Sequence, residues 1–386
     1  LTGKHQVAPI VMASTDTNNS KTVSSSTSSP STPTKTATTK TTATPPIQSS
    51  LEVPSLANNS NGSSSTSTSS TNASLTGAND SNYDPFAGLS FRVGVAENKN
   101  TTFRNKMEDV HTYIANFAER VDWGYFAIFD GHAGKDTARW CGNNLHTLLE
   151  EEIDRNSDEG SPPPTPITGK DDLREDLYKC FVKADELIEK SGQGKSGCTA
   201  AVAVLRWESD NEEPVSHTKS QDGGKFDFKP TKNHKRLLYT SNVGDLRIVL
   251  CRAGQAYRLS YDHKATDTHE INRIEDNGGL VLKNRVNGVL AVTRSLGDTY
   301  MKLLVIGVPF TTATEITADD EFIIIACDGL WDVVSDKHAC KLAAESFKQG
   351  YSPLQVAKKL CQFAIELSTT DNVTVMVVQL DNDVFS

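Results

Sequence analysis

The chain has 386 residues, which suffices for one large domain or two ordinary ones. It is acidic, with 39 Lys and Arg residues against 49 Asp and Glu residues, and no concentrated Lys/Arg block stands out, which argues against nucleic acid or an anionic membrane as the main partner. No apolar run approaches transmembrane length. The seven cysteines include no Cys-x-x-Cys pair, which favours a reduced protein of the cytoplasm or nucleus. Because the first residue is Leu rather than Met, targeting signals upstream of it stay open.

Residues 1–82 consist mainly of Ser, Thr, Asn, Ala and Pro, with hardly an aromatic side chain. Such a segment cannot bury enough apolar surface to offset the entropy of ordering its backbone, so we predict a disordered tail over residues 1–82. The composition shifts near Tyr83 and no second shift follows, which predicts one domain over residues 83–386. Two polar segments, 156–170 and 208–235, are predicted loop insertions in this domain.

Within this domain, strands are predicted in groups with helices inserted between the groups. This order argues against a parallel sheet with strict strand–helix alternation and favours antiparallel sheets covered by helices. Ser352, Pro353 and Gln355 show the N-cap, first-turn proline and capping-box pattern of a helix start. In chain order, the predicted elements are a half-buried strand at 91–95, a buried strand at 125–129, helices at 135–153 and 173–188, strands at 199–207 and 237–251, a short helix at 269–276, strands at 290–293 and 322–327, two helices, and a last strand at Val373–Leu380.

Acidic residues stand at the ends of these apolar strands. Asp130 and Asp328 each follow one, Asp245 lies in a hairpin, and Asp371 precedes the last strand. Carboxylates this close to buried strands repel one another and are costly to desolvate unless a cation lies among them. Hard divalent cations prefer oxygen ligands, and two such ions bridged by one carboxylate lower the pKa of a water held between them. Asp130 is the best-placed bridge, because Gly131 beside it leaves a backbone carbonyl accessible.

Each of these aspartates has an alternative interpretation as a turn former or a helix N-cap, which explains any one of them better than the whole set.

Arg104 by itself belongs to a solvated charge cluster, but beside metal ions its planar fork would suit two oxygens of a phosphate. His132 by itself is a surface histidine, but two residues from the bridging acid it is a candidate general acid. The sequence supplies no recognisable nucleophile motif, neither Cys-x5-Arg, Gly-x-Ser-x-Gly nor a Gly-x4-Gly-Lys phosphate loop.

A series of short motifs follows one another along the chain. In order they are Arg104-x-x-Met107-Glu108-Asp109, Phe129-Asp130-Gly131-His132, Ser196-Gly197-Cys198-Thr199-Ala200, Asn242-Val243-Gly244-Asp245-x-Arg247, Asp262-His263-Lys264, Gly278-Gly279, Ala291-Val292-Thr293-Arg294-Ser295-Leu296-Gly297-Asp298, Ala326-Cys327-Asp328-Gly329-Leu330-Trp331-Asp332 and Thr370-Asp371-Asn372-Val373-Thr374. In these motifs and their order the chain resembles the metal-dependent protein serine/threonine phosphatases of type 2C, over roughly residues 86–380.

The resemblance implies an α+β fold, a central sandwich of two antiparallel β-sheets flanked by α-helices on both faces, with a metal site at one end. It implies two magnesium or manganese ions and leaves room for a third, more weakly bound. The implied roles are as follows: Asp130 bridges both ions, the Gly131 carbonyl binds one, Asp328 and Asp371 bind the other, Glu108 and Asp109 hold the water network, Arg104 binds the phosphate, His132 is the general acid, and Asp245, Asp328 and Asp332 hold the third ion.

The implied reaction is direct attack of a metal-bridged hydroxide on phosphoserine or phosphothreonine, without a phosphoenzyme. Residues 285–288 and 309–312 look most like small fungal members that damp stress-responsive MAP-kinase signalling, which predicts phosphorylated MAP-kinase cascade components as substrates and a monomeric enzyme. The sequence departs from the family's frequent Asp-His-Lys-Pro at Asp262-His263-Lys264-Ala265 and in the two insertions, none of which includes a predicted metal ligand.

Two other functions compete with this one. The first is a catalytically weak pseudophosphatase that binds phosphoproteins; the retention of Asp130, Asp328 and Asp371 argues against it. The second keeps two-metal chemistry but acts on phosphodiesters or small phosphate esters, and the acidic composition makes nucleic acid an unfavourable substrate.

Overall fold

A computed structural model of the chain describes residues 88–120, 122–155, 172–192, 194–209 and 230–385. These residues belong to one compact unit. The predicted disordered tail, residues 1–82, and the predicted insertion at 156–170 lie outside the described residues.

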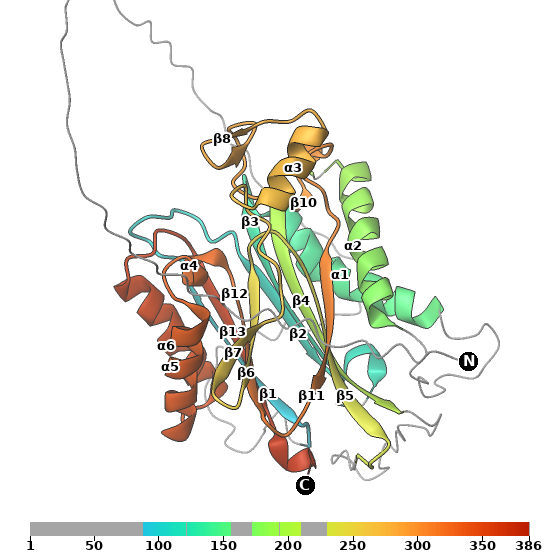
Figure 1. Cartoon of the computed structure of the whole chain (residues 1–386), viewed down its shortest axis with the longest axis vertical. Helices are drawn as coiled ribbons and strands as arrows, with labels where there is room; N and C mark the ends of the chain where they lie inside the picture. The colour runs from blue at the N-terminus through green and yellow to red at the C-terminus, as the bar shows by residue number, and fades with distance from the viewer. Residues whose placement is uncertain (1–87, 121, 156–171, 193, 210–229, 386) are drawn as a thin grey trace, which may run out of the picture. The chain divides into compact units, whose positions relative to one another are not determined.

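Two antiparallel sheets form the centre of the fold (Figure 1). The first sheet has the strand order β1-β13-β12-β6-β7 and the second has the order β11-β5-β4-β3-β2, with β10 paired to β4. The first sheet contains β1 (Phe91–Asn98), β6 (Arg247–Arg252), β7 (Gln255–Arg258), β12 (Asp320–Ala326) and β13 (Val373–Leu380). The second contains β2 (Val110–Ala115), β3 (Gly124–His132), β4 (Gly197–Ser209), β5 (His234–Val243), β10 (Leu296–Gly297) and β11 (Phe310–Ile316).

The alternation of side chains along the strands divides the core into three layers. In β3, Phe126 and Ile128 face the first sheet and pack with Ile323, Ile325 and Met376, as expected for a period of two. The intervening residues of β3 pack instead against α1 (Asp136–Arg155) and α2 (Leu173–Lys190). The outer face of the first sheet is covered by α4 (Asp328–Trp331), α5 (Asp336–Lys348) and α6 (Pro353–Glu366). The α+β sandwich with helices on both faces is therefore confirmed (Figure 1).

A smaller group of elements joins β7 to β11. It contains α3 (Thr268–Asp276), a hairpin of β8 (Val281–Leu282) and β9 (Arg285–Val286), and the short 3-10 helix η2 (Thr299–Met301), and it has its own apolar cluster. Two more short 3-10 helices, η1 (Phe117–Glu119) and η3 (Asn382–Phe385), complete the described elements. The predicted strand at residues 290–293 is wrong, since Val292 forms only an isolated bridge with Lys264. The backbone of Thr293 is bonded elsewhere, because its N–H donates to the His263 carbonyl and its own carbonyl accepts from the Arg273 side chain.

Two predicted boundaries also change. Strand β3 continues through Asp130 to His132, because these residues pair with residues 197–199 of β4. The predicted insertion at 208–235 begins and ends in strands, since Glu208 pairs with Lys235 in the β4–β5 ladder, and only residues 210–229 lie outside the described residues.

The predicted N-cap and capping box of α6 are confirmed. All seven cysteines are buried and free, and none of the described helices is long and apolar enough to cross a membrane.

Candidate metal centre

Acidic side chains from separate elements meet at one end of the sandwich. Asp130 lies near the end of β3, Asp109 directly precedes β2, Asp328 follows β12, and Asp371 lies just before β13. Period-two alternation places Asp130 on the same face as Phe126 and Ile128, toward the opposite sheet. Oxygens of Asp109 and Asp130 lie within 4.8 Å of each other and of the Cys327 sulfur. These acids, from four separate elements, therefore lie at the same end of the sandwich.

The electrostatics of this cluster favour a bound cation. Loss of solvent raises the pKa of Asp130 well above its usual range, and the carboxylates of Asp109, Asp328 and Asp371 raise it further. Asp328 has its pKa raised for the same two reasons, and burial raises the pKa of Asp109 to about 6. Within the described residues, one buried oxygen of Asp109 and one of Asp328 have no hydrogen-bond partner. Mutually repelling carboxylates with unpaired oxygens are the donor set that a hard divalent cation satisfies.

Cys327 is not expected to be a ligand, although its sulfur is close. Burial raises the pKa of this thiol well above its usual range, and the sulfur donates to the Asn372 carbonyl at 3.4 Å. A protonated thiol ligates poorly, and Mg²⁺ and Mn²⁺ prefer oxygen. The atoms that fit Mg²⁺ or Mn²⁺ at this site are therefore oxygen atoms alone.

Asn372 holds the acid-bearing segments together, a role that the sequence motif alone did not reveal. Its side-chain amide donates to the carbonyls of Lys99 and Lys106, at 2.8 and 3.0 Å, and its Oδ1 accepts from the Glu108 N–H at 3.0 Å. Its own N–H donates to Asp371 Oδ1 at 2.7 Å. The partly exposed Glu108 is thereby held beside Asp109, to whose Oδ2 Thr374 Oγ1 donates at 2.6 Å.

Two glycines permit this close packing. A Cβ on Gly131 would lie 2.8 Å from the Glu108 carbonyl oxygen, and a Cβ on Gly329 would lie 1.9 Å from the Asn372 carbonyl oxygen. Both distances are shorter than real Cβ contacts, so any side chain at these positions would push the acid-bearing segments apart.

Arg104 lies at the edge of this cluster. Its Nη2 is 2.6 Å from Asp371 Oδ2, and its Nε donates to the Thr370 carbonyl at 3.1 Å. The side chain is 44% exposed, so the guanidinium neutralises one predicted ligand and also faces solvent. The structure thus places the predicted phosphate-binding arginine beside the predicted metal ligands.

His132 also lies at this end of the sheet, and its Nε2 is 2.6 Å from Oδ2 of Asp298. Asp298 belongs to a motif noted in the sequence, but no spacing rule relates residue 298 to residue 132. This buried partner is a functional candidate that the sequence analysis missed.

A lysine side chain lies between two acids of the predicted third ion site. The Lys264 ammonium lies 2.7 Å from Asp332 Oδ1 and 3.6 Å from Asp245 Oδ2. Burial acts to lower the pKa of Lys264, but the carboxylates of Asp245 and Asp332 outweigh it, so the pKa is raised and the ammonium stays charged. No local sequence pattern places a lysine between these acids, because Lys264 lies 68 positions from Asp332.

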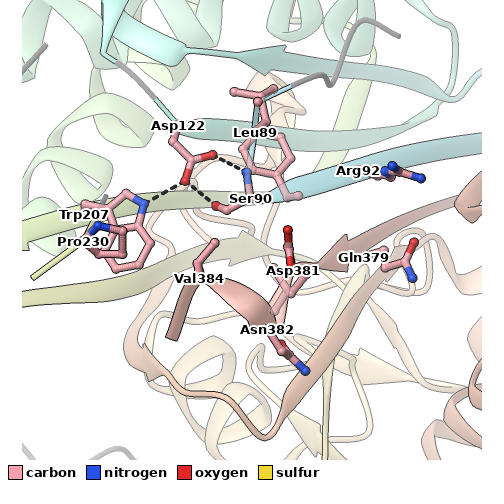
Figure 2. A pocket seen from close by; sticks show the side chains of 13 residues that line it. Leu89, Ser90, Arg92, Asp122, Trp207, Pro230, Gln379, Asp381, Asn382 and Val384 are labelled. Atoms are coloured by element: carbon pink, nitrogen blue, oxygen red, sulfur yellow. Dashed lines mark hydrogen bonds between the residues drawn. The ribbon is translucent and has the colours of Figure 1, made fainter. Parts of the chain in front are cut away.

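A cavity of about 500 Å³ lies at the other end of the strands, near the start of β1 and the end of β13 (Figure 2). Its buried carboxylate, Asp122, already accepts hydrogen bonds from the Ser90 N–H, the Ser90 hydroxyl and Trp207 Nε1 (Figure 2). A carboxylate engaged in this way has a structural role, so the acidic cluster is the stronger candidate for a reaction centre.

The chain is similar in sequence to known proteins. A family model described as protein phosphatase 2C matches residues 93–373. The chain is 52% identical over 292 residues to protein phosphatase 2C homolog 1 of Saccharomyces cerevisiae, which covers 76% of this chain and 94% of that protein. It is 42% identical over 301 residues to the protein of the same name from Schizosaccharomyces pombe, covering 78% of this chain and 76% of that protein.

Solved structures share the fold at lower identity. A Caenorhabditis elegans sex-determining protein superposes with a TM-score of 0.60 at 24% identity, covering 77% of this chain and 67% of that one. A serine-threonine phosphatase 2C from Toxoplasma gondii gives 0.57 at 20% identity, covering 75% of this chain and 95% of that one.

Proposed function

Because the chain belongs to the protein phosphatase 2C family and is a metal-dependent protein serine/threonine phosphatase, we propose that the acidic cluster around Asp130 is its reaction centre. The observation that carries the proposal is the meeting of Asp109, Asp130, Asp328 and Asp371 at one end of the sandwich. The pKa values of Asp109, Asp130 and Asp328 are raised, and one buried oxygen each of Asp109 and Asp328 has no hydrogen-bond partner among the described residues. Two ions, magnesium or manganese, would be held there. Asp130 would contact both, Gly131 would offer its carbonyl, and Asp328 and Asp371 would complete the set.

When bound, such ions would supply a water of lowered pKa for direct attack on phosphorus and would offset charge on the phosphoryl oxygens. The chain's own residues orient the water, bind the phosphate and donate the proton. Glu108 and Asp109 orient water at the cluster, while Asn372 holds the Glu108 backbone and Thr374 holds the Asp109 carboxylate. Arg104, exposed beside Asp371, presents its planar fork to two phosphoryl oxygens. His132 donates a proton to the leaving oxygen of serine or threonine.

The proposal is tested with a phosphothreonine peptide and millimolar Mn²⁺ or Mg²⁺. We expect phosphate release by the wild-type chain, none after chelation, and recovery when metal is restored. Asp130→Asn should lower kcat by a factor of about 10³ or more, since it removes the shared ligand. The matched control is Glu366→Gln, an exposed acid at the end of α6, which should retain wild-type activity. Hydrolysis that survives chelation would refute the metal mechanism.

We further propose that the substrates are phosphorylated components of a stress-responsive MAP-kinase cascade, met in the cytoplasm or nucleus, and that the enzyme acts as a monomer. The fungal character of residues 285–288 and 309–312 supports this choice of pathway, and the fungal relatives are compatible with it. An Asp130→Asn trap incubated with extracts of stressed cells should retain phosphorylated kinases of that cascade. Retention of unrelated phosphoproteins alone would contradict the choice.

A pseudophosphatase that only binds phosphoproteins is the alternative from another class. Its distinguishing result would be phosphopeptide binding with no phosphate release at any metal concentration. The gathering of the predicted metal-binding aspartates around Asp130 supports the active enzyme instead.

A further inference from the structure

Residues from three of the sequence motifs meet around one contact. His132 ends β3, Gly197 opposite it begins β4, and Asp298 directly follows β10. Strand β10 pairs with the start of β4, Gly297 opposite Gly197, and the Asp298 N–H donates to the Ser196 carbonyl at 3.1 Å. This pairing places the Asp298 carboxylate 2.6 Å from His132 Nε2.

The Asp298 carboxylate is fully buried, whereas the His132 side chain is 27% exposed. Asp298 Oδ2 also accepts a hydrogen bond from Ser295 Oγ at 2.5 Å. Its other oxygen, Oδ1, has no hydrogen-bond partner within the described residues. A buried carboxylate is costly unless a cation or a strong donor faces it, and the His132 imidazole faces Oδ2, the same oxygen to which Ser295 donates.

The surrounding backbone leaves room for this pair and for little else. A Cβ on Gly197 would lie 2.1 Å from Asp298 Oδ2 and 2.3 Å from His132 Nε2, so any larger residue would separate them. Asp298 itself has a left-handed backbone, with φ of 47°, a conformation that Asp tolerates better than most residues. The contact therefore depends on Gly197 and on a turn that aims the Asp298 side chain at His132.

We propose that Asp298 is a positioning residue for His132, holding its ring in the orientation and tautomer that general acid catalysis requires. The inference rests on the proposed function. Because Asp298 accepts from Nε2–H, Nδ1 is the ring nitrogen that carries the transferable proton. As the P–O bond to the leaving oxygen breaks and its electron pair moves to that oxygen, the Nδ1 proton passes to it. The ring is left neutral with its hydrogen on Nε2, the tautomer that Asp298 binds.

The test compares two esters whose leaving groups differ in their need for a proton. A phosphothreonine peptide leaves as an alkoxide and needs one, whereas p-nitrophenyl phosphate leaves as a stable phenolate. Asp298→Asn should lower kcat for the peptide by roughly tenfold to a hundredfold, up to the low end of what a general acid contributes because His132 itself remains, with KM little changed. The loss for p-nitrophenyl phosphate should be at least about fivefold smaller. In a His132→Gln background, Asp298→Asn should add almost nothing, because its effect passes through the imidazole.

Two further variants separate positioning from local folding. Ser295→Ala removes a donor to Asp298 and should give a weaker form of the same ester-dependent pattern, which keeps the test usable where Asp298→Asn folds poorly. Asp185→Asn is the matched control, since Asp185 accepts from the Gly297 N–H at 2.9 Å and supports the same loop without touching His132. Asp185→Asn should slow both esters equally.

Equal losses on both esters for Asp298→Asn, or an undiminished loss in the His132→Gln background, would overturn the inference and leave the phosphatase assignment intact. A wild-type chain that hydrolyses neither ester with Mn²⁺ present would overturn the proposed function, and this inference with it.

Discussion

Replacing Asp109 by Asn should stabilise the metal-free chain while impairing the enzyme. Asp109 is 2% exposed, and burial raises its pKa from the ordinary 3.8 to about 6. One pKa unit corresponds to about 1.36 kcal/mol, so ionised Asp109 costs the metal-free fold about 3 kcal/mol at neutral pH. The substituted amide would keep an oxygen to accept from Thr374 and would carry no charge. We expect a gain of about 1–3 kcal/mol in the unfolding free energy in urea with EDTA.

The pH dependence of this effect has a definite sign. Because the folded pKa of Asp109 exceeds its unfolded pKa, the destabilisation is absent below pH 3.8, grows as pH rises, and is complete above about pH 6. The metal-free wild type should therefore be more stable at pH 5 than at pH 7.5, by about 1.4 kcal/mol from Asp109 alone. The pKa of Glu270 is lowered to about 2 although burial acts to raise it, because hydrogen bonds from Arg294 and Arg273 outweigh burial. Its contribution therefore changes only below pH 4.5, outside this window.

Asp320→Asn is the matched control. Asp320 is also fully buried, but it accepts from Arg252 at 2.7 and 2.8 Å and so serves the fold. This variant should lose about 1–3 kcal/mol under the same conditions, because it weakens a charged hydrogen-bonded pair. The reasoning would be refuted if metal-free Asp109→Asn proved less stable than the wild type at pH 7.5.

Three further predictions follow from the site. Lys264→Met should raise the number of bound Mn²⁺ ions from two to three in a calorimetric titration, since the ammonium no longer occupies the position between Asp245 and Asp332; an unchanged count would show that the lysine is not what excludes the ion. Asn372→Ala should lower the unfolding free energy by about 2–4 kcal/mol in urea and weaken Mn²⁺ binding, because it removes three side-chain bonds to the backbone between β1 and β2; binding as tight as the wild type would argue against an organising role. Arg104→Lys should raise KM for the phosphopeptide roughly tenfold with a smaller change in kcat, since it keeps charge but loses the planar fork, whereas an unchanged KM would exclude phosphate binding.

The parts of this fold that were predictable from sequence depend on local patterns. The apolar runs of β3 and β13, the capping box of α6 and the acids beside the strand ends are all encoded within a few neighbouring residues. Once the acids are taken together, the cost of burying like charges points to a cation.

The features that escaped prediction depend on contacts between residues far apart in the chain. Asp298 reaches His132 across 166 positions, and Lys264 reaches Asp332 across 68. Residues 290–293 read as a strand because they are apolar, but the Arg273 side chain and the His263 carbonyl occupy the backbone groups of Thr293 that a ladder would use. In each case tertiary hydrogen bonding decides, and no local pattern records it.

The most direct test of the account is crystallographic location of manganese by anomalous diffraction from crystals grown with Mn²⁺. We predict two peaks within the acidic cluster, with the Asp130 carboxylate in contact with both and with Asp328 and Asp371 as ligands to one of them. No peak beside Asp130, or a peak ligated by the Cys327 sulfur, would contradict the oxygen-ligated two-ion centre on which the proposed mechanism depends.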